Sequence, residues 1–170
     1  MDIEVSTAPG PAHAGQLRWQ GETYQCALGR AGTVDIKREG DGATPRGRFS
    51  LREVLFRADR LDRPKTLLPV RPLRPTDGWC DAPTDPNYNC AVTHPYPASA
   101  EYLWRDEDVY DLIIILGYNL DPITPGAGSA IFCHVATAEF SATDGCIALH
   151  CQVLLKILAT STPDTYMEIT

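Results

Sequence analysis

Two stretches decide the fold and point to the chemistry: Ser129-Ala-Ile-Phe-Cys-His134 and, after a short polar segment, Thr143-Asp-Gly-Cys-Ile-Ala-Leu149. The first contains an apolar run typical of a buried β-strand, and the second sets a cysteine on a glycine turn. The first ends in a histidine, and the second places Cys146 directly after a glycine. If the extended chain folds back, imidazole and thiol come into contact. A histidine beside a cysteine lowers the thiol pKa and later returns the proton, so the pair predicts a cysteine nucleophile.

The size and charge of the chain restrict what it does. Its 170 residues, 44% of them hydrophobic, predict a single domain over 1–170. A net charge of −7 argues against nucleic acid as a partner. The longest apolar run, Leu112 to Leu116, is too short to span a membrane. The first ten residues show no secretory signal, which predicts a cytoplasmic protein if this start is native.

The remaining pattern is mainly that of short strands separated by turns. A helix is expected over 150–159, because apolar residues there recur on one stripe. Since Cys146 lies just upstream, we expect the helix dipole and the Gly145 and Cys146 amides to favour a thiolate and an oxyanion. Strands are expected at 16–20, 23–28, 33–37, 48–56, 110–118, 130–135 and 165–170.

A proline-rich segment interrupts this pattern. Eight of the fourteen prolines lie between Pro64 and Pro97, with three aromatic residues and little periodicity. Such a long irregular segment indicates either a lid or a surface insertion, and we expect a capping insert at about 60–105. Cys80 and Cys90 bracket part of it, so a disulfide there stays open as an alternative to free thiols.

Three motifs in order then resemble a known family. Gly40-Asp-Gly-Ala-Thr-Pro-Arg-Gly-Arg-Phe49, His134 and the Thr143–Leu149 stretch are similar to the L,D-transpeptidase catalytic domain, also called YkuD. The similarity runs from about Thr23 to the C-terminus. It implies a mainly β, sandwich-like fold, with one short helix after the cysteine and, here, the long proline-rich insert.

The resemblance also implies an activity. Family members attack a peptidoglycan stem peptide with the cysteine and pass the acyl group to a diaminopimelate amine on a second stem. They need no metal or cofactor, and carbapenems often acylate their cysteine. The roles implied here are Cys146 as nucleophile, His134 as general base, Gly145 in the oxyanion hole, and Tyr118, Asn119, Thr143, Asp144 and Trp79 as substrate contacts.

The sequence departs from the family in several places: the interval from His134 to Cys146 is short, Val135 replaces a glycine, and the motif around Cys146 differs. Family members usually have Ser-His-Gly-Cys followed by an arginine, whereas here Asp144 replaces the histidine and the arginine is absent. A carboxylate beside the nucleophile opposes thiolate formation unless it points away or orients His134. The compact form resembles an alpha- and betaproteobacterial variant associated with donor L-alanine (1-3 crosslinks) rather than diaminopimelate (3-3 crosslinks). This substrate implies the periplasm and a role in cell-wall biogenesis and cell shape.

Three alternatives stay open. Water could resolve the same acyl-enzyme, giving an L,D-carboxypeptidase or amidase. A zinc site could use the cysteines and histidines near Cys146, but Cys133 and His134 are adjacent on a strand and so face opposite ways. Finally, the chain could be a peptidoglycan-binding module without activity, although it keeps both Cys146 and His134. Its oligomeric state is not predicted.

Overall fold

One long strand organises the computed structural model, which describes residues 2–170. This strand, β6 (Gly47–Phe56), pairs through its first half with β14 (Tyr166–Ile169) and through its second half with β11 (Leu112–Leu116). Ser50 of β6 contacts both neighbouring segments. Tyr166 of β14 is its register partner, and the Ser50 carbonyl accepts the amide of Gly117, which follows β11, at 2.8 Å. The two neighbours therefore lie on opposite edges of β6.

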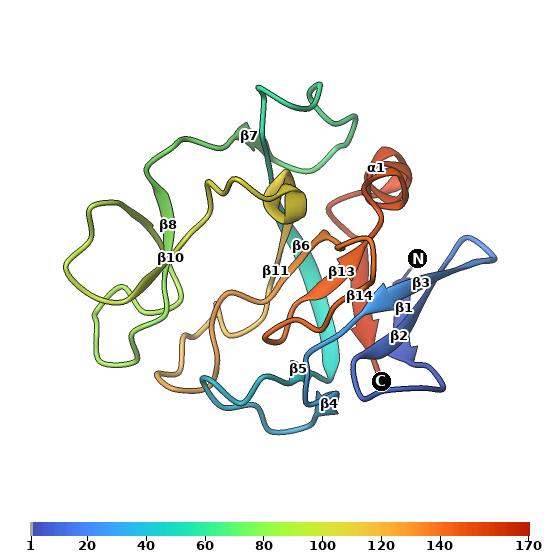
Figure 1. Cartoon of the computed structure of the whole chain (residues 1–170), viewed down its shortest axis with the longest axis horizontal. Helices are drawn as coiled ribbons and strands as arrows, with labels where there is room; N and C mark the ends of the chain where they lie inside the picture. The colour runs from blue at the N-terminus through green and yellow to red at the C-terminus, as the bar shows by residue number, and fades with distance from the viewer. Residues whose placement is uncertain (1) are drawn as a thin grey trace.

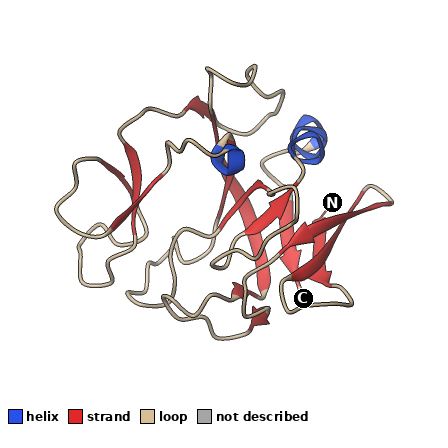
Figure 2. Ribbon diagram, viewed as in Figure 1, coloured by secondary structure: helices blue, strands red, loops and turns tan. Residues whose placement is uncertain are grey.

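Pairing on both edges of β6 closes the main sheet into a barrel-like ring (Figures 1 and 2). The strands follow the order β11-β12-β13-β3-β2-β1-β14-β6, and β6 then returns to β11. The bounds of the other members are β1 (Asp2–Thr7), β2 (Ala14–Trp19), β3 (Glu22–Ala27), β12 (Phe132–Val135) and β13 (Ile147–Leu149). The structure does not confirm the predicted sandwich of two sheets, because one strand long enough to pair twice joins the sheet to itself.

The strands near β11 are buried on both faces. Ile114 belongs to the cluster inside the ring, whereas its neighbours Ile113 and Ile115 belong to a second cluster on the outer face. The same alternation places Cys133 inside and Phe132 outside. A strand that is covered on both faces needs a continuous apolar run, which explains the sequence of β11.

The single α-helix closes the interior. Helix α1 (Cys151–Thr160) confirms the predicted helix to within a residue, and its Leu154, Ile157 and Leu158 pack into the inner cluster. No helix within residues 2–170 is long and apolar enough to cross a membrane. Strand β14 likewise falls inside the predicted 165–170, whereas the strand predicted at 33–37 is only β4 (Thr33–Val34), which pairs with β5 (Thr44–Pro45).

The proline-rich segment contains more regular structure than its sequence indicated. It forms β7 (Val70–Pro72) beside β6 and a separate three-stranded sheet of β8 (Asp77–Cys80), β9 (Ala91–Thr93) and β10 (Ala100–Tyr102). Strands of three or four residues are too short to show alternation, so the sequence pattern missed them. In Figure 1 this small sheet lies to the left of β6 and β11.

The small sheet packs on the outer face of the ring. Trp79 and Leu103 join the outer cluster, as does Tyr110 of the short 3-10 helix η1 (Asp108–Tyr110). Cys80 and Cys90 are free thiols, although the Cys80 amide donates to the Cys90 carbonyl at 2.9 Å. The proline-rich segment and η1 therefore pack together over β11, β12 and β13, although they are distant from β12 and β13 in sequence.

The double burial of β11 can be tested by truncation. Ile114→Ala removes a side chain that is 0% exposed, so the free energy of unfolding should fall by about 2–5 kcal/mol. Urea denaturation followed by circular dichroism measures the change. The matched control is Ile36→Ala, where the isoleucine is 82% exposed and the expected change is within about 0.5 kcal/mol. Equal losses in both variants would contradict the described core.

Candidate active site

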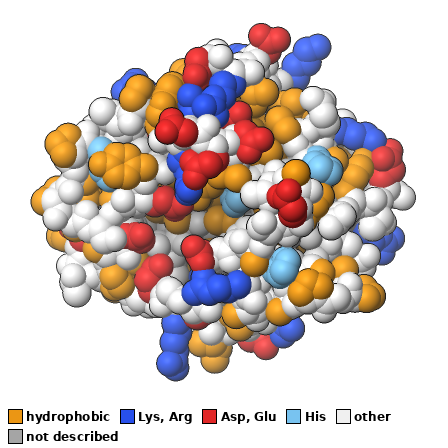
Figure 3. Space-filling view, viewed as in Figure 1, with side chains coloured by type: hydrophobic (Ala, Val, Ile, Leu, Met, Phe, Trp, Pro, Cys, Tyr) orange, Lys and Arg blue, Asp and Glu red, His pale blue; other side chains and the backbone are white. Residues whose placement is uncertain are grey.

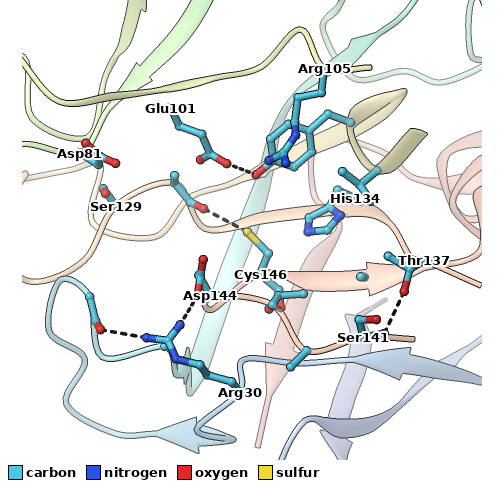
Figure 4. A pocket seen from close by; sticks show the side chains of 18 of the residues that line it. Arg30, Asp81, Glu101, Arg105, Ser129, His134, Thr137, Ser141, Asp144 and Cys146 are labelled. Carbon is cyan, nitrogen blue, oxygen red and sulfur yellow. Dashed lines mark hydrogen bonds and ion pairs between the residues drawn. The ribbon is translucent and has the colours of Figure 1, made fainter. Parts of the chain in front are cut away.

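The parallel pairing of β12 with β13 brings the predicted imidazole and thiol together. Its register sets Cys133 opposite Ile147 and His134 opposite Ala148. Because side chains alternate along a strand, Cys146 lies on the same outer face as Phe132, Ala148 and His134. Figure 4 shows Cys146 and His134 pointing into one cavity. The two residues thus line one cavity through a parallel crossover rather than through the fold-back that the sequence indicated.

The turn before Cys146 is held by Thr143. The Thr143 hydroxyl donates to the Cys146 carbonyl at 2.7 Å and accepts the Gly145 amide at 3.2 Å. Gly145 has φ +134°, and a Cβ there would stand 2.7 Å from the Ala43 carbonyl oxygen. Only glycine fits this close approach of two backbones. Thr143 lines the cavity, but its hydroxyl is occupied in the turn.

The Cys146 thiol rests in its protonated form. It is 8% exposed, donates to the Ala130 carbonyl at 3.2 Å and accepts the Phe132 amide at 3.4 Å. Burial raises its pKa to about 12, and the charge of Glu101 adds to that effect. The Phe132 amide and the charge of Lys37 oppose the rise in pKa. The structure therefore favours a thiol at rest, where the sequence had indicated a thiolate.

Lys37 supports the nucleophile turn from behind. Its side chain is 3% exposed, and its ammonium donates to Asp41 at 2.7 Å and to the Ala43 carbonyl at 2.9 Å. A Cβ on Gly145 would lie 3.2 Å from its Nζ, so the charge stands beside the turn. This buried cation lies three residues before the Gly40–Phe49 motif, and its charge opposes the rise in the pKa of Cys146. No sequence pattern singled out Lys37.

His134 is placed as a neutral base. Its Nδ1 lies 2.9 Å from the Val135 carbonyl, which can only accept, so the neutral ring carries its proton on Nδ1 and its lone pair on Nε2. Burial lowers the pKa of the ring below its ordinary 6.5, although the carbonyls of Val135 and Val109 favour the protonated form. The ring of Tyr110 packs edge-on against the imidazole at 5.2 Å. His134 is therefore oriented and unprotonated at neutral pH.

Thiol and imidazole open into a cavity of about 570 Å³ between the ring and the proline-rich segment. Charged side chains gather around this hollow (Figure 3). The charged members of its lining are Arg30, Glu39, Asp81, Glu101, Arg105 and Asp144. Several of them come from elements distant from Cys146 in sequence, so neighbourhood in sequence could not have indicated them.

Asp144 points away from the nucleophile. Its side chain is 93% exposed and forms an ion pair with Arg30, whose guanidinium also donates to the Gly40 carbonyl at 3.2 Å. Figure 4 shows Arg30 beside Asp144. The charge of Asp144 still contributes to the raised pKa of Cys146, as the sequence led us to expect. Asp144 does not orient His134.

Three predicted substrate contacts do not line the cavity. The Tyr118 hydroxyl donates to the Ala127 carbonyl at 2.5 Å, and Asn119 Nδ2 donates to the Gly128 carbonyl at 2.9 Å, so both shape the loop before β12. Trp79 is buried against Phe132 at 5.2 Å between ring centroids. These three residues lie close to the site in sequence or in space. They pack behind the residues that line the cavity and do not face it.

Asn89 links the proline-rich segment to the loop that contacts Cys146. Its Oδ1 accepts the Trp79 indole at 2.9 Å and the Ala130 amide at 3.0 Å, while its Nδ2 donates to the Asn119 carbonyl at 2.7 Å. Ala130 in turn accepts the Cys146 thiol. A buried asparagine with four polar partners orders the loop that holds the sulfur.

Two other expectations are corrected or refined. Strand β13 separates Cys146 from α1, so the helix N-terminus does not lie at the sulfur and its dipole does not act there. Cys133 faces the inner cluster and His134 the cavity, which confirms that they point to opposite faces. Among residues 2–170, no group of three or more histidine, cysteine or acidic side chains is placed to hold a metal.

Comparison with known proteins identifies a family. The family model described as the YkuD L,D-transpeptidase catalytic domain matches residues 13–169. No curated protein and no solved structure gives a significant match. The match spans the whole ring except β1, and it includes Cys146 and His134.

The protonation state of Cys146 can be measured by alkylation. With a pKa raised to about 12, the reaction with iodoacetamide should be slow at neutral pH and rise about tenfold per pH unit between about pH 7 and 10. Peptide mass spectrometry follows Cys146 alone. In denaturant the same thiol should level off near its ordinary 9.0. A plateau below about pH 7 in the folded protein would instead reveal a preformed thiolate–imidazolium pair.

Proposed function

Because the chain belongs to the L,D-transpeptidase (YkuD) family, we propose that it crosslinks peptidoglycan stem peptides through an acyl-enzyme on Cys146. The observation that carries the proposal is the pairing of β12 with β13, which directs Cys146 and His134 into one charged cavity. A nucleophile and a base that share a cavity meet the first requirement for acyl transfer.

The first half-reaction forms the acyl-enzyme. His134 Nε2 takes the proton of the Cys146 thiol while the sulfur attacks the carbonyl of an L-centre in the donor stem. The carbon–nitrogen bond breaks as the imidazolium returns that proton to the leaving amine. Since thiol and imidazole both rest neutral, proton transfer accompanies attack. This lets a buried thiol react without a stable thiolate in an apolar site.

The second half-reaction transfers the acyl group. The side-chain amine of diaminopimelate on a second stem attacks the thioester, His134 takes its proton, and the thiolate leaves and is reprotonated. The donor is either the L-alanine at position one or diaminopimelate. If water attacks instead, the product is the free acid of an L,D-carboxypeptidase or amidase.

Other parts of the chain have proposed roles in this reaction. The Gly145 amide would exchange its long bond to Thr143 for the developing oxyanion. Residues 60–105 would act as a cap that limits water, which is supported by the packing of Trp79 and Leu103 on the outer cluster. We propose the periplasm as the compartment, because crosslinked peptidoglycan is the substrate class.

Removal of the nucleophile tests the function. Purified muropeptides incubated with wild-type protein should give dimers in intact-mass analysis, and fragmentation should identify the donor residue. Cys146→Ala should abolish the product, since no other group can carry the acyl chain. A carbapenem should add its mass to the wild-type protein but not to this variant.

The matched control is Cys151→Ala on α1, which removes a half-buried thiol outside the cavity. It should keep full activity, and both variants should retain the wild-type circular dichroism spectrum. Equal turnover by Cys146→Ala and wild-type protein would refute the mechanism. Cys146-dependent trimming without dimers would move the function to hydrolysis.

The pH dependence of acylation tests His134. A base must be neutral to act, so the rate should rise with pH through the pKa of the ring. Burial lowers that pKa below 6.5, so the acid limb of the acylation rate should lie below this value and the rate should be flat at neutral pH. Single-turnover mass spectrometry from about pH 4.5 to 8 measures it. A midpoint of this pH dependence above 7 would contradict a neutral base. His134→Gln should abolish the pH dependence and most of the acylation rate.

A further inference from the structure

A buried lysine stands behind the nucleophile turn. The Lys37 side chain is 3% exposed, and it lies outside the set of residues that line the cavity. Burying an ammonium ion is unfavourable unless charged or polar partners compensate for the lost water. A lysine that served only solubility would lie at the surface. The burial of Lys37 therefore points to a local role for its charge.

Two glycines make room for this side chain. A Cβ on Gly128 would lie 2.8 Å from Cε of Lys37 and 3.0 Å from Cδ, so the aliphatic stem passes directly against Gly128. A Cβ on Gly145 would lie 3.2 Å from Nζ. The stem thus runs past the loop before β12, and the ammonium ends beside the residue that precedes Cys146.

The charge of the ammonium is only partly compensated. Lys37 Nζ donates to Asp41 at 2.7 Å and to the Ala43 carbonyl at 2.9 Å, although an ammonium has three N–H groups. Within residues 2–170, no third acceptor lies within hydrogen-bond distance of Nζ. The Asp41 side chain is 25% exposed, so water screens its carboxylate more than it screens the buried ammonium. Positive charge therefore reaches the turn.

Charges of both signs act on the sulfur. Those of Glu101 on the small sheet and of Asp144 beside the nucleophile raise the pKa of Cys146, whereas the charge of Lys37 lowers it. The two arginines that line the cavity are partly exposed and already paired with carboxylates. Lys37 is thus the buried cation that favours negative charge at Cys146.

We propose that the Lys37 ammonium stabilises the negative charge that develops on the Cys146 sulfur and on the donor carbonyl oxygen during acylation. The inference rests on the proposed function and assigns a residue to its first half-reaction. As His134 takes the thiol proton, charge builds on the sulfur and then on the oxygen assigned to the Gly145 amide. Lys37 keeps its own proton and acts through space from behind Gly145, where the low dielectric of a buried site strengthens its field.

A purely structural role is the alternative. The ion pair of Lys37 with Asp41 spans the start of the Gly40–Phe49 motif, and the ammonium also holds the Ala43 carbonyl that approaches Gly145. A structural tie is lost when either end is removed, so Lys37→Met and Asp41→Asn would then weaken the site alike. A charge effect has a sign, so the two variants should shift the chemistry in opposite directions.

Alkylation tests the effect on the sulfur without any stem peptide. Folded wild-type protein, Lys37→Met and Asp41→Asn react with iodoacetamide at about pH 8, and peptide mass spectrometry gives the rate at Cys146. Loss of the cation disfavours the thiolate, so the rate should fall about threefold to tenfold in Lys37→Met. Loss of the carboxylate leaves the cation uncompensated, so the rate should rise about twofold or more in Asp41→Asn.

Single-turnover acylation tests the effect on the reaction. A donor muropeptide is added, and intact mass gives the rate of acyl-enzyme formation. This rate should fall about tenfold or more in Lys37→Met and should not fall in Asp41→Asn. The double variant removes both charges and leaves no unpaired carboxylate. Its acylation rate should stay below that of Asp41→Asn alone.

The matched control is Lys65→Met, because Lys65 is exposed and lies outside the cavity. This variant should keep both rates. Circular dichroism and urea denaturation show whether each variant is folded. If Lys37→Met does not fold, Asp41→Asn decides by itself, since faster alkylation with undiminished acylation is the signature of a charge effect.

The outcomes are distinct. Slower alkylation and slower acylation in both Lys37→Met and Asp41→Asn would overturn the inference and show that the pair is structural. Opposite shifts in alkylation with equal acylation rates would also overturn it, since the charge would then act on the resting sulfur alone. Failure of wild-type protein to form an acyl-enzyme with any stem peptide would instead remove the proposed function, and the assignment to acylation with it, even where the alkylation rates shift as expected.

Discussion

The site depends on the parallel register between β12 and β13. With His134 opposite Ala148, imidazole and thiol fall on the outer face, and Cys133 and Ile147 fall inside. Because side chains alternate, a slip of one residue would bury one reactive group in the core and expose an apolar one. The residues that pack inside the ring therefore determine the register between β12 and β13. That register in turn sets the positions of Cys146 and His134.

Burial on both faces explains the electrostatics of that pair. The proline-rich segment covers the outer face, and the desolvation that follows raises the pKa of Cys146 and lowers that of His134. Both groups rest uncharged, and backbone groups hold them: the Ala130 carbonyl and the Phe132 amide contact Cys146, and the Val135 carbonyl contacts His134. Hydrogen bonds in such a buried setting are stronger than in water.

Much of the secondary structure could be predicted because it rests on local patterns. Helix α1 and the strands around 16–28, 48–56 and 112–135 follow from apolar periodicity and turn residues. Closure of the ring could not be predicted, since it depends on β6 pairing with both β14 and β11. The short strands of the small sheet were missed because three or four residues carry no readable period.

The sequence by itself determined the family and singled out Cys146 and His134 as the candidate reactive pair, because Gly145-Cys146, His134 and the Gly40–Phe49 motif are local and specific. Only the tertiary structure decided what surrounds the pair. Asp81 and Glu101 reach the cavity through the register of β8 and β10, and Arg30 reaches Asp144 because Gly29 and Thr143 form a parallel bridge. The physical reason is that charge and burial act through space, so neighbours distant along the chain set the environment of Cys146.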